Sequence, residues 1–112
     1  MPRLLMVSFN NARPGREDDF DRWYDERHLR DVLGVKHFVK AQRFRIDPAA
    51  GGAAFGFRYM TIFEADSEDI QALTVALAER AGTELMPLTD AMVDERLRLW
   101  AHPIGPETAA EG

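Results

Sequence analysis

Two β-prone segments with apolar residues on both faces place the strongest constraint on how this chain folds. Residues 3–9 contain the run LLMV, and residues 57–64 combine aromatic and β-branched side chains that favour extended structure. Residues 37–46 and 93 to about 102 instead alternate apolar with charged side chains, which is typical of edge strands. The sequence therefore predicts a four-stranded sheet in which the first and third strands are central.

Two helical patterns separate these strands. Residues 16 to about 31 begin with three carboxylates, which favour the positive end of a helix dipole. A second helix is predicted to start at Asp66 or Ser67 and to end before Gly82. Residues 47–56 are rich in Pro, Gly and Ala, and they predict a flexible hairpin connection. The order βαββαβ predicts an α+β, ferredoxin-like fold with an antiparallel sheet and both helices on one face.

The length of the chain bounds its organisation. One domain over residues 1–102 and a flexible tail over 103–112 account for all 112 residues. Two helices cover only one face of a four-stranded sheet, so apolar residues of the first strand are expected on the other face. An exposed apolar surface of roughly a few hundred Å² usually marks an interface. We predict a homodimer that packs sheet face against sheet face; the alternative is a monomer with a modest apolar patch.

Composition excludes several classes of partner. Fourteen Lys and Arg against nineteen Asp and Glu give a net charge of −5 with no basic block, which argues against nucleic-acid binding. No apolar run approaches the roughly 18 residues of a membrane span, and no signal peptide is recognised. With no cysteine, the chain is expected in the cytoplasm. The three histidines lack metal-ligand spacing and no nucleotide-binding motif occurs, so we expect neither metal nor cofactor.

The first predicted helix carries the candidate site. Its expected inner face changes from aromatic to titratable side chains within two turns, in the order Phe20, Trp23, Tyr24, Arg27, His28, Asp31. Trp and Tyr offer flat apolar area with one polar group each, which suits the wall of a small-molecule pocket. His28 is the side chain whose ordinary pKa lies near neutrality, so it is the candidate general acid–base. The alternative is a histidine at the surface or core edge, paired with Asp31 or Asp25.

The segment FDRWYDERHLRDVLGVKHFVKAQRF, residues 20–44, resembles the signature of the dimeric α+β barrel superfamily, closest to its EthD-like members. That signature runs F-x-x-W-Y-x-x-x-H and continues through a turn into a strand with arginine and an aromatic residue. Its matches here are Phe20, Trp23, Tyr24, His28, Val35, Phe38, Arg43 and Phe44. Lys36-His37 stands where the Pro-Gly of the usual turn is expected.

The resemblance implies a ligand site between the sheet and the helices, with His28 at the pocket and Trp23 and Tyr24 as its aromatic wall. Such proteins include cofactor-independent monooxygenases, cyclases, isomerases and lyases. The resemblance does not select one reaction, because fold does not fix function.

Four further residues are candidates with open alternatives. Arg27 and Arg43 are each expected to stabilise negative charge on a ligand, whereas an edge arginine is more often solvated. Tyr59 either donates to a ligand carbonyl or packs in the core. Glu95 shares a predicted strand face with apolar neighbours, so it is either a buried base or a residue at the rim.

We therefore expect a small-molecule-binding protein, with three hypotheses for its role. The first is a cofactor-free enzyme of the isomerase, lyase, cyclase or monooxygenase type, acting by acid–base chemistry on an enolisable aromatic or cyclic metabolite. The second is a non-catalytic ligand-binding or accessory dimer. The third is a structural dimerisation module, in which the space beside the inner face of the first predicted helix is filled by the protein's own side chains.

Overall fold

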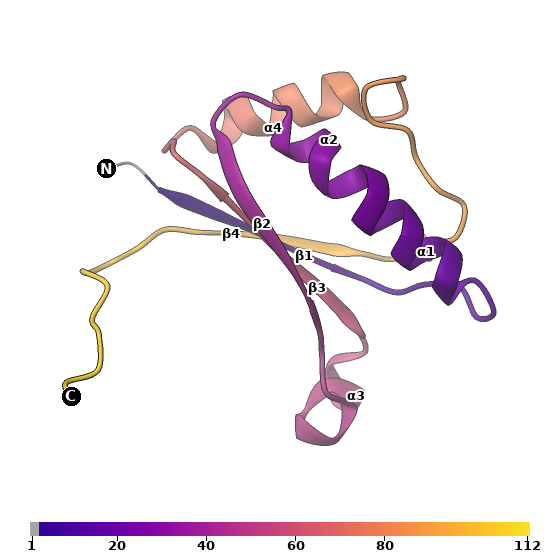
Figure 1. Ribbon diagram of the computed structural model, residues 1–112, viewed down its shortest axis with the longest axis horizontal. Helices are drawn as coiled ribbons and strands as arrows, with labels where there is room; N and C mark the ends of the chain where they lie inside the picture. The colour runs from indigo at the N-terminus through magenta and orange to yellow at the C-terminus, as the bar shows by residue number, and fades with distance from the viewer. Residues whose placement is uncertain (1–2) are drawn as a thin grey trace.

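The structure, a computed structural model, describes residues 3–112 and confirms the predicted α+β, ferredoxin-like arrangement (Figure 1). Four antiparallel strands form one sheet in the order β2-β3-β1-β4. The strands are β1 (Leu4–Asn10), β2 (Phe38–Arg45), β3 (Tyr59–Ala65) and β4 (Leu97–Ala101). The two segments that are apolar on both faces are therefore the central strands, as predicted.

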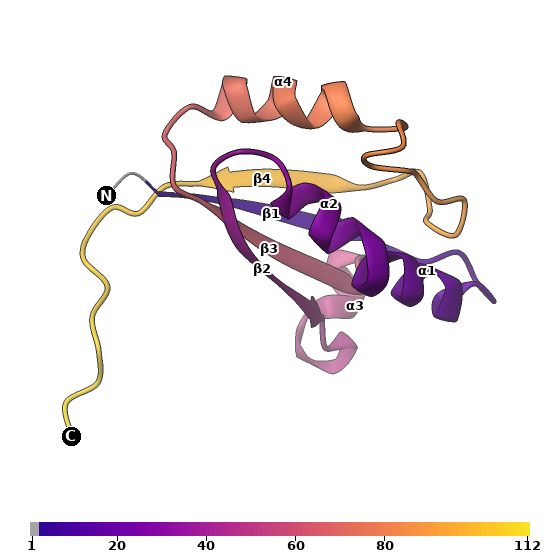
Figure 2. The same cartoon turned by 45° about the horizontal axis from the view of Figure 1, so that its top comes forward.

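All the helices except the short one over residues 52–55 cover one face of this sheet (Figure 2). A continuous helical stretch consists of α1 (Glu17–Trp23), a π-helical segment (Tyr24–His28) and α2 (Leu29–Leu33), and α4 (Ile70–Arg80) lies beside it over the same face. The core between the layers includes Leu4, Phe20 and Phe63, all almost completely buried. Across residues 3–112, no helix has both the length and the apolar character needed to cross a membrane.

Two predicted connections differ from the structure. Residues 47–56 form a 3-10 turn (Pro48–Ala50) followed by the short helix α3 (Gly52–Phe55), because Asp47 accepts a hydrogen bond from the Ala49 amide at 2.8 Å. The second predicted helix starts later than expected, since its N-cap is Asp69 rather than Asp66 or Ser67. The Asp69 carboxylate accepts a hydrogen bond from the Ala72 amide at 2.9 Å, which is ordinary capping geometry.

The last strand is also shorter than predicted, because it begins at Leu97 and ends at Ala101. Residues 93–96 approach it as an irregular segment, and residues 103–112 contain no helix or strand. In the sheet, Ser8 lies opposite both Thr61 and Arg98, so the three side chains belong to the same, helix-facing side. This register decides which residues of β4 reach the space below the helices.

The opposite face of the sheet carries apolar side chains over three strands. Val7 of β1 lies between Ile62 of β3 and Leu99 of β4, and Leu99 is 48% exposed. At one end, the Phe55 ring of α3 meets the Phe9 ring edge-on, with centroids 4.9 Å apart. In the part of the chain that the structure describes, α3 is the one helix placed toward this face (Figure 2).

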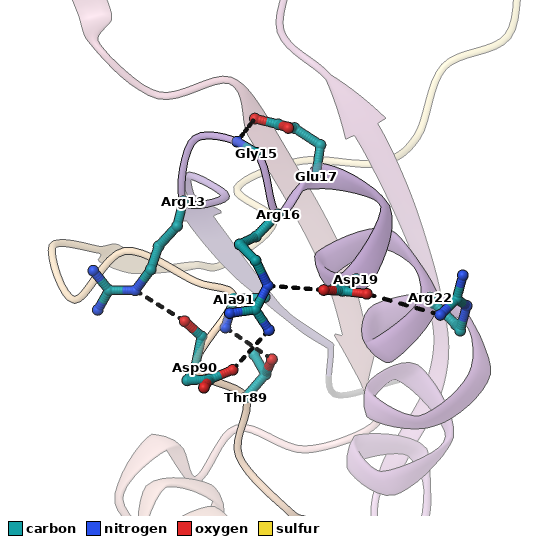
Figure 3. A network of polar contacts seen from close by, with 9 residues as sticks. All are labelled: Arg13, Gly15, Arg16, Glu17, Asp19, Arg22, Thr89, Asp90 and Ala91. Atoms are coloured by element: carbon teal, nitrogen blue, oxygen red, sulfur yellow. Dashed lines mark hydrogen bonds and ion pairs between the residues drawn. The ribbon is translucent and has the colours of Figure 1, made fainter.

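A polar network joins the start of α1 to the segment that leads into β4 (Figure 3). The Arg13 backbone amide donates to the Ala91 carbonyl at 2.7 Å, and the Arg13 side chain donates to the Asp90 carbonyl at 2.9 Å. Arg16 contacts the carboxylates of Asp19 at 2.8 Å and Asp90 at 2.9 Å. This network holds residues 87–92 against the helical layer.

Candidate functional site

A π-helical turn organises the candidate site. The Leu29 amide donates to the carbonyl of Tyr24, five residues back, in place of the usual four-residue spacing. In a regular α-helix, Trp23 and His28 would point about 140° apart around the axis. Here their rings stack, with centroids 4.3 Å apart and planes inclined by 18°. The π turn therefore brings the tryptophan and the histidine to the same side of the helix, and such turns are frequent at functional sites.

The same turn changes which residues face the sheet after His28. Arg27 falls on the inner stripe by helical periodicity, but it is exposed, and its Nε pairs with Asp31 at 3.0 Å. Its guanidinium also donates to the Glu84 carbonyl. Val32 is instead the buried residue of α2. One extra residue in the turn thus rotates the inner stripe. Tyr24 and His28 lie on the cavity side, and Arg27, whose orientation the sequence left open between inward and along the surface, lies along the surface.

Below this turn lies a cavity of about 460 Å³, bounded by the helical layer and the β1–β4 side of the sheet. This volume is within the range of roughly 300–1,000 Å³ found for ligand pockets. Strands β1 and β3 form the floor of the cavity with Met6, Ser8, Asn10 and Phe63. The helices and the loop after α4 form its roof, with Tyr24, His28, Val32, Thr74, Leu77, Ala78, Ala81, Met86 and Leu88. Arg96, Leu97 and Arg98, on and just before β4, line its remaining side. Because Leu88 and both arginines are exposed, the cavity opens to solvent at the β4 edge.

His28 is held in its neutral form. Burial lowers its pKa to about 4, and the positive charges of Arg98 and Arg96 act in the same direction, while Asp31 opposes them. Its Nδ1 is buried and has no hydrogen-bond partner among the described residues. A buried ring nitrogen without a partner carries a free-energy cost. At neutral pH the cavity wall therefore contains an unprotonated imidazole whose Nδ1 has no hydrogen-bond partner among the described residues.

Two further polar side chains, Asn10 and Tyr24, line the cavity with His28. Asn10 Oδ1 lies at the end of β1 in the cavity wall and is also buried without a hydrogen-bond partner among the described residues. Tyr24 closes the cavity next to His28, with ring centroids 4.9 Å apart. Burial raises the pKa of the Tyr24 phenol, so this group stays protonated at neutral pH. The cavity wall thus contains a neutral imidazole beside a protonated phenol.

Trp23 supports the site from behind. It does not line the cavity, but it stacks on His28 and its Nε1 donates to the Pro87 carbonyl at 3.0 Å. Pro87 belongs to the segment that Arg13 and Arg16 anchor to the helix. The indole therefore fixes the plane of the imidazole rather than contacting a ligand in the cavity.

Arg43 and Tyr59 lie in a second cluster, on the β2 side of the sheet. The Arg43 guanidinium donates to Asp25 and to Asp21, both at 2.8 Å. It also lies over the rings of Phe20, Tyr24 and Tyr59, at 4.7 to 5.7 Å from their centroids. The structure therefore places Arg43 and Tyr59 in a cluster where the guanidinium is paired with carboxylates, away from the His28 cavity. Both residues line a separate, smaller hollow of about 260 Å³.

Glu95 is the remaining candidate, and it lies apart from the cavity. It is exposed, it precedes β4, and it is not among the lining residues. Of the seven residues that the sequence singles out, the structure brings only Tyr24 and His28 to the cavity wall, with Trp23 immediately behind them. In residues 3–112 no three His, Asp or Glu side chains gather in an arrangement that could hold a metal ion.

Sequence reasoning missed several polar residues of this site, namely Ser8, Asn10, Thr74, Arg96 and Arg98. A signal for Ser8 and Asn10 exists in the alternation of β1. Leu4 and Met6 point toward the helices, and the next residues with the same parity are Ser8 and Asn10. The buried face of β1 therefore becomes polar toward its end, which marks a place where the core gives way to a pocket.

No protein-family model, no curated protein and no solved structure matches this chain. The function is therefore argued from the geometry of the cavity.

Proposed function

We propose that this protein binds a small organic molecule in the cavity beside His28 and exchanges a proton with it, acting without a cofactor. The observation that carries this proposal is the buried, unpartnered Nδ1 of a neutral histidine in the wall of a 460 Å³ cavity. A structural histidine would have its buried nitrogen satisfied by a neighbouring side chain or carbonyl. The packing alternative, a pair with Asp31 or Asp25, is not what the structure contains, because these carboxylates bond Arg27 and Arg43.

The chemistry that fits is proton transfer at an enolisable carbon. The neutral imidazole accepts the proton from the carbon, and the electron pair of the broken C–H bond moves onto the carbonyl oxygen. The Tyr24 phenol supplies a donor for that developing negative charge. The imidazolium then returns its proton to another atom of the same ligand, which completes an isomerisation, or assists departure of a leaving group in a lyase. An aromatic or cyclic ligand suits the apolar wall.

The second candidate function is ligand binding without turnover. The observation that favours it is the pKa of about 4 for His28, which makes the imidazole a weak base in the empty cavity. In such a protein the histidine provides a hydrogen bond to the ligand and no proton leaves the ligand's carbon.

An exchange experiment separates the two. The enolisable aromatic ketone 2-tetralone is incubated with the protein in D₂O, and deuterium incorporation is followed by NMR. We expect exchange faster than in buffer, a loss of at least tenfold in His28→Gln, and no change in the control His102→Gln, whose histidine is exposed near the C-terminus. The melting temperatures of both variants are measured in parallel. Saturable binding without exchange supports the second function, and equal exchange in wild type and His28→Gln contradicts the first.

We also propose that the chain belongs to the dimeric α+β barrel superfamily and forms a homodimer through its open sheet faces. Support comes from the βαββαβ order, the F-x-x-W-Y-x-x-x-H segment and the apolar residues of β1, β3 and β4 on the face opposite α1, α2 and α4. A second copy fits this face because a two-fold interface uses the same surface twice.

Sedimentation equilibrium tests the dimer. Leu99 on the open face is 48% exposed and Val75 on α4 is 49% exposed, so they form a matched pair. Leu99→Lys is expected to shift the protein to monomer, because it places like charges in an apolar contact. Val75→Lys is expected to leave the mass unchanged. A wild-type monomer at the highest soluble concentration would contradict the proposal.

A further inference from the structure

Positive charge gathers at the mouth of the cavity. Arg96 and Arg98 are two residues apart on the approach to β4 and on the strand itself, and both line the cavity. Arg98 lies opposite Ser8 in the sheet register, on the side that faces the helices. The two guanidinium groups therefore belong to the same side of the strand as the cavity.

Neither arginine has a protein anion to neutralise it. Within residues 3–112 six arginines form ion pairs with carboxylates, namely Arg3, Arg13, Arg16, Arg22, Arg27 and Arg43. Arg96 and Arg98 form none, and among the unpaired arginines they are the two that line this cavity. No Asp or Glu is among the residues that line the cavity. The chain carries nineteen acidic and fourteen basic side chains, so a cavity wall with two arginines and no carboxylate departs from its overall composition.

Burial and mutual repulsion act on the charged groups at this opening. Burial lowers the pKa of Arg98, and the charge of Arg96 lowers it further. Both arginines also act to lower the pKa of His28, against the opposing charge of Asp31 from α2. Folding therefore places two like charges and a histidine around one opening whose lining contains no carboxylate.

We propose that the ligand of this cavity is a small organic anion: an apolar ring or chain that carries one carboxylate. The anion would pair with Arg96 and Arg98 at the mouth, and the apolar body would lie against Met6, Phe63 and Leu77 inside. The planar guanidinium group binds carboxylates through two parallel hydrogen bonds, which gives the mouth an orienting role. This inference deepens the proposed function and rests on it for the cavity being a ligand site, but it adds the charge and the orientation of the ligand.

The size and shape of the site exclude larger anions. A cavity of about 460 Å³ takes a body of one or two fused rings, and the two arginines form no extended basic stripe of the kind a nucleic-acid backbone requires. An inorganic phosphate would satisfy the arginines but would leave the apolar wall without a partner. Inorganic phosphate is therefore the natural competitor in a test.

Pairs of acids and amides with similar shapes test whether the charge of the ligand contributes to binding. Binding of benzoate, cinnamate and 2-naphthoate is measured by calorimetry beside their neutral amides, benzamide, cinnamamide and 2-naphthamide. We expect at least one acid to bind ten or more times more tightly than its amide at low ionic strength. This ratio should fall with added salt, because the arginines are accessible to solvent.

Substitutions of the two arginines test whether they cause the preference for acids over amides. Arg96→Gln and Arg98→Gln should each reduce the acid-to-amide ratio, and the double variant should bring it close to one. The control is Arg45→Gln, because Arg45 is an exposed arginine at the far edge of the sheet and does not line this cavity. Inorganic phosphate should compete only at concentrations far above those of the acid.

A second readout follows because His28 lines the same cavity as the two arginines. Trp23 and Tyr24 also contact this imidazole, and Asp31 acts on its charge. Burial raises the pKa of the Tyr24 phenol, which therefore stays neutral between pH 5 and pH 7. A bound carboxylate should raise the His28 pKa, so the imidazole resonances followed by NMR should titrate at higher pH in the complex. Binding should correspondingly strengthen as the pH falls from 7 toward 5.

The outcomes distinguish this inference from the function on which it rests. If acids and amides bind equally well, the cavity is a ligand site and the anion proposal is wrong. If only phosphate binds, the mouth is an anion site and the apolar body of the ligand is refuted. If none of the six probes binds, both the anion proposal and the ligand site fail. An acid preference that survives in the double variant also overturns the assignment to Arg96 and Arg98.

Discussion

Polar and charged side chains lie on both sides of Tyr24, and the two sides differ in whether these groups have partners within the described residues. On the β2 side, the Arg43 guanidinium lies 4.7 Å from the Tyr24 ring centre and bonds two carboxylates. On the β4 side, the His28 ring lies 4.9 Å from the same ring, with its Nδ1 unpartnered, and Arg96 and Arg98 have no counter-charge within residues 3–112. One helical segment therefore supplies a wall of a charge-paired cluster and a wall of the candidate site.

The two sides differ in whether the protein itself stabilises a buried polar or charged group. Burial acts to lower the pKa of Arg43, but hydrogen bonds to Asp25 and Asp21 outweigh it and raise the pKa. The result is a cation that the fold itself stabilises. Around His28 the fold removes water and adds the positive charges of Arg98 and Arg96, which Asp31 opposes, and Nδ1 has no hydrogen-bond partner among the described residues.

The largest expected effect is a pH-dependent loss of stability from His28. Its folded-state pKa is about 4, against 6.5 for the free side chain, so between these values the unfolded chain binds a proton that the folded chain does not. Stability should therefore be unaffected above pH 6.5 and should fall as the pH drops from 6.5 to 4, by about 3 kcal/mol from this group. Urea unfolding at a series of pH values measures it.

Carboxylates titrate in part of the same window, so the measurement needs two variants. His28→Gln should lose the component between pH 6.5 and 4, while His102→Gln should retain it because that histidine is exposed near the C-terminus. Equal pH slopes for wild type and His28→Gln would mean that the imidazole is protonated in the folded protein. The cavity side would then resemble the Arg43 side, with a satisfied charge.

A smaller loss is expected from the Arg43 cluster. Arg43→Met keeps most of the apolar stem against the aromatic rings but leaves Asp21 and Asp25 without their common cation. The Arg43 side chain is 16% exposed and that of Asp25 is 60% exposed, so solvent compensates part of the lost pairing. We expect a loss of about 2 kcal/mol by urea unfolding at pH 7. A change below about 0.5 kcal/mol would show that the cluster is a solvated surface feature.

The sequence was sufficient for the architecture because the fold depends on patterns that are repeated along the chain. Apolar residues on both faces of residues 3–9 and 57–64 predict central strands, and the structure places β1 and β3 at the centre. Gly82 marks the end of the second helix, and it follows the C-cap of α4 with a φ of +81°. Each of these signals is local, so tertiary contacts did not need to be known.

The site was predictable only up to the π turn. Phe20 and Tyr24 are buried as the 3.6-residue period predicts, but one inserted residue then moves Arg27 outward and Val32 inward. Such an insertion leaves no mark in the periodicity, because the sequence after it fits either face. The residue His37 shows a second limit: it adopts a φ of +83°, the conformation that favours glycine, at the turn where the family resemblance expects Pro-Gly.

The arginines of β4 were missed for a different reason. Charged residues on an edge strand are usually explained by protection against aggregation, and Arg96 and Arg98 fit that explanation in the sequence. Their role depends on which face of β4 is turned to the helices, and this is set by the pairing of Ser8 with Arg98. Register between strands far apart in sequence is not contained in the alternation of either strand alone.

The smallest expected effect has the opposite sign from the loss at Arg43. Arg98→Met retains a long apolar stem, removes a cation that Arg96 repels and leaves no protein carboxylate unpaired. We expect the free energy of unfolding to rise by roughly 0.5 kcal/mol at pH 7 and low ionic strength, and the gain to shrink as salt screens the repulsion. Arg45→Met, at the far edge of the sheet, should leave stability within experimental error. A loss above about 1 kcal/mol in Arg98→Met would mean that the fold itself relies on this arginine, and the difference between the two sides of Tyr24 would disappear.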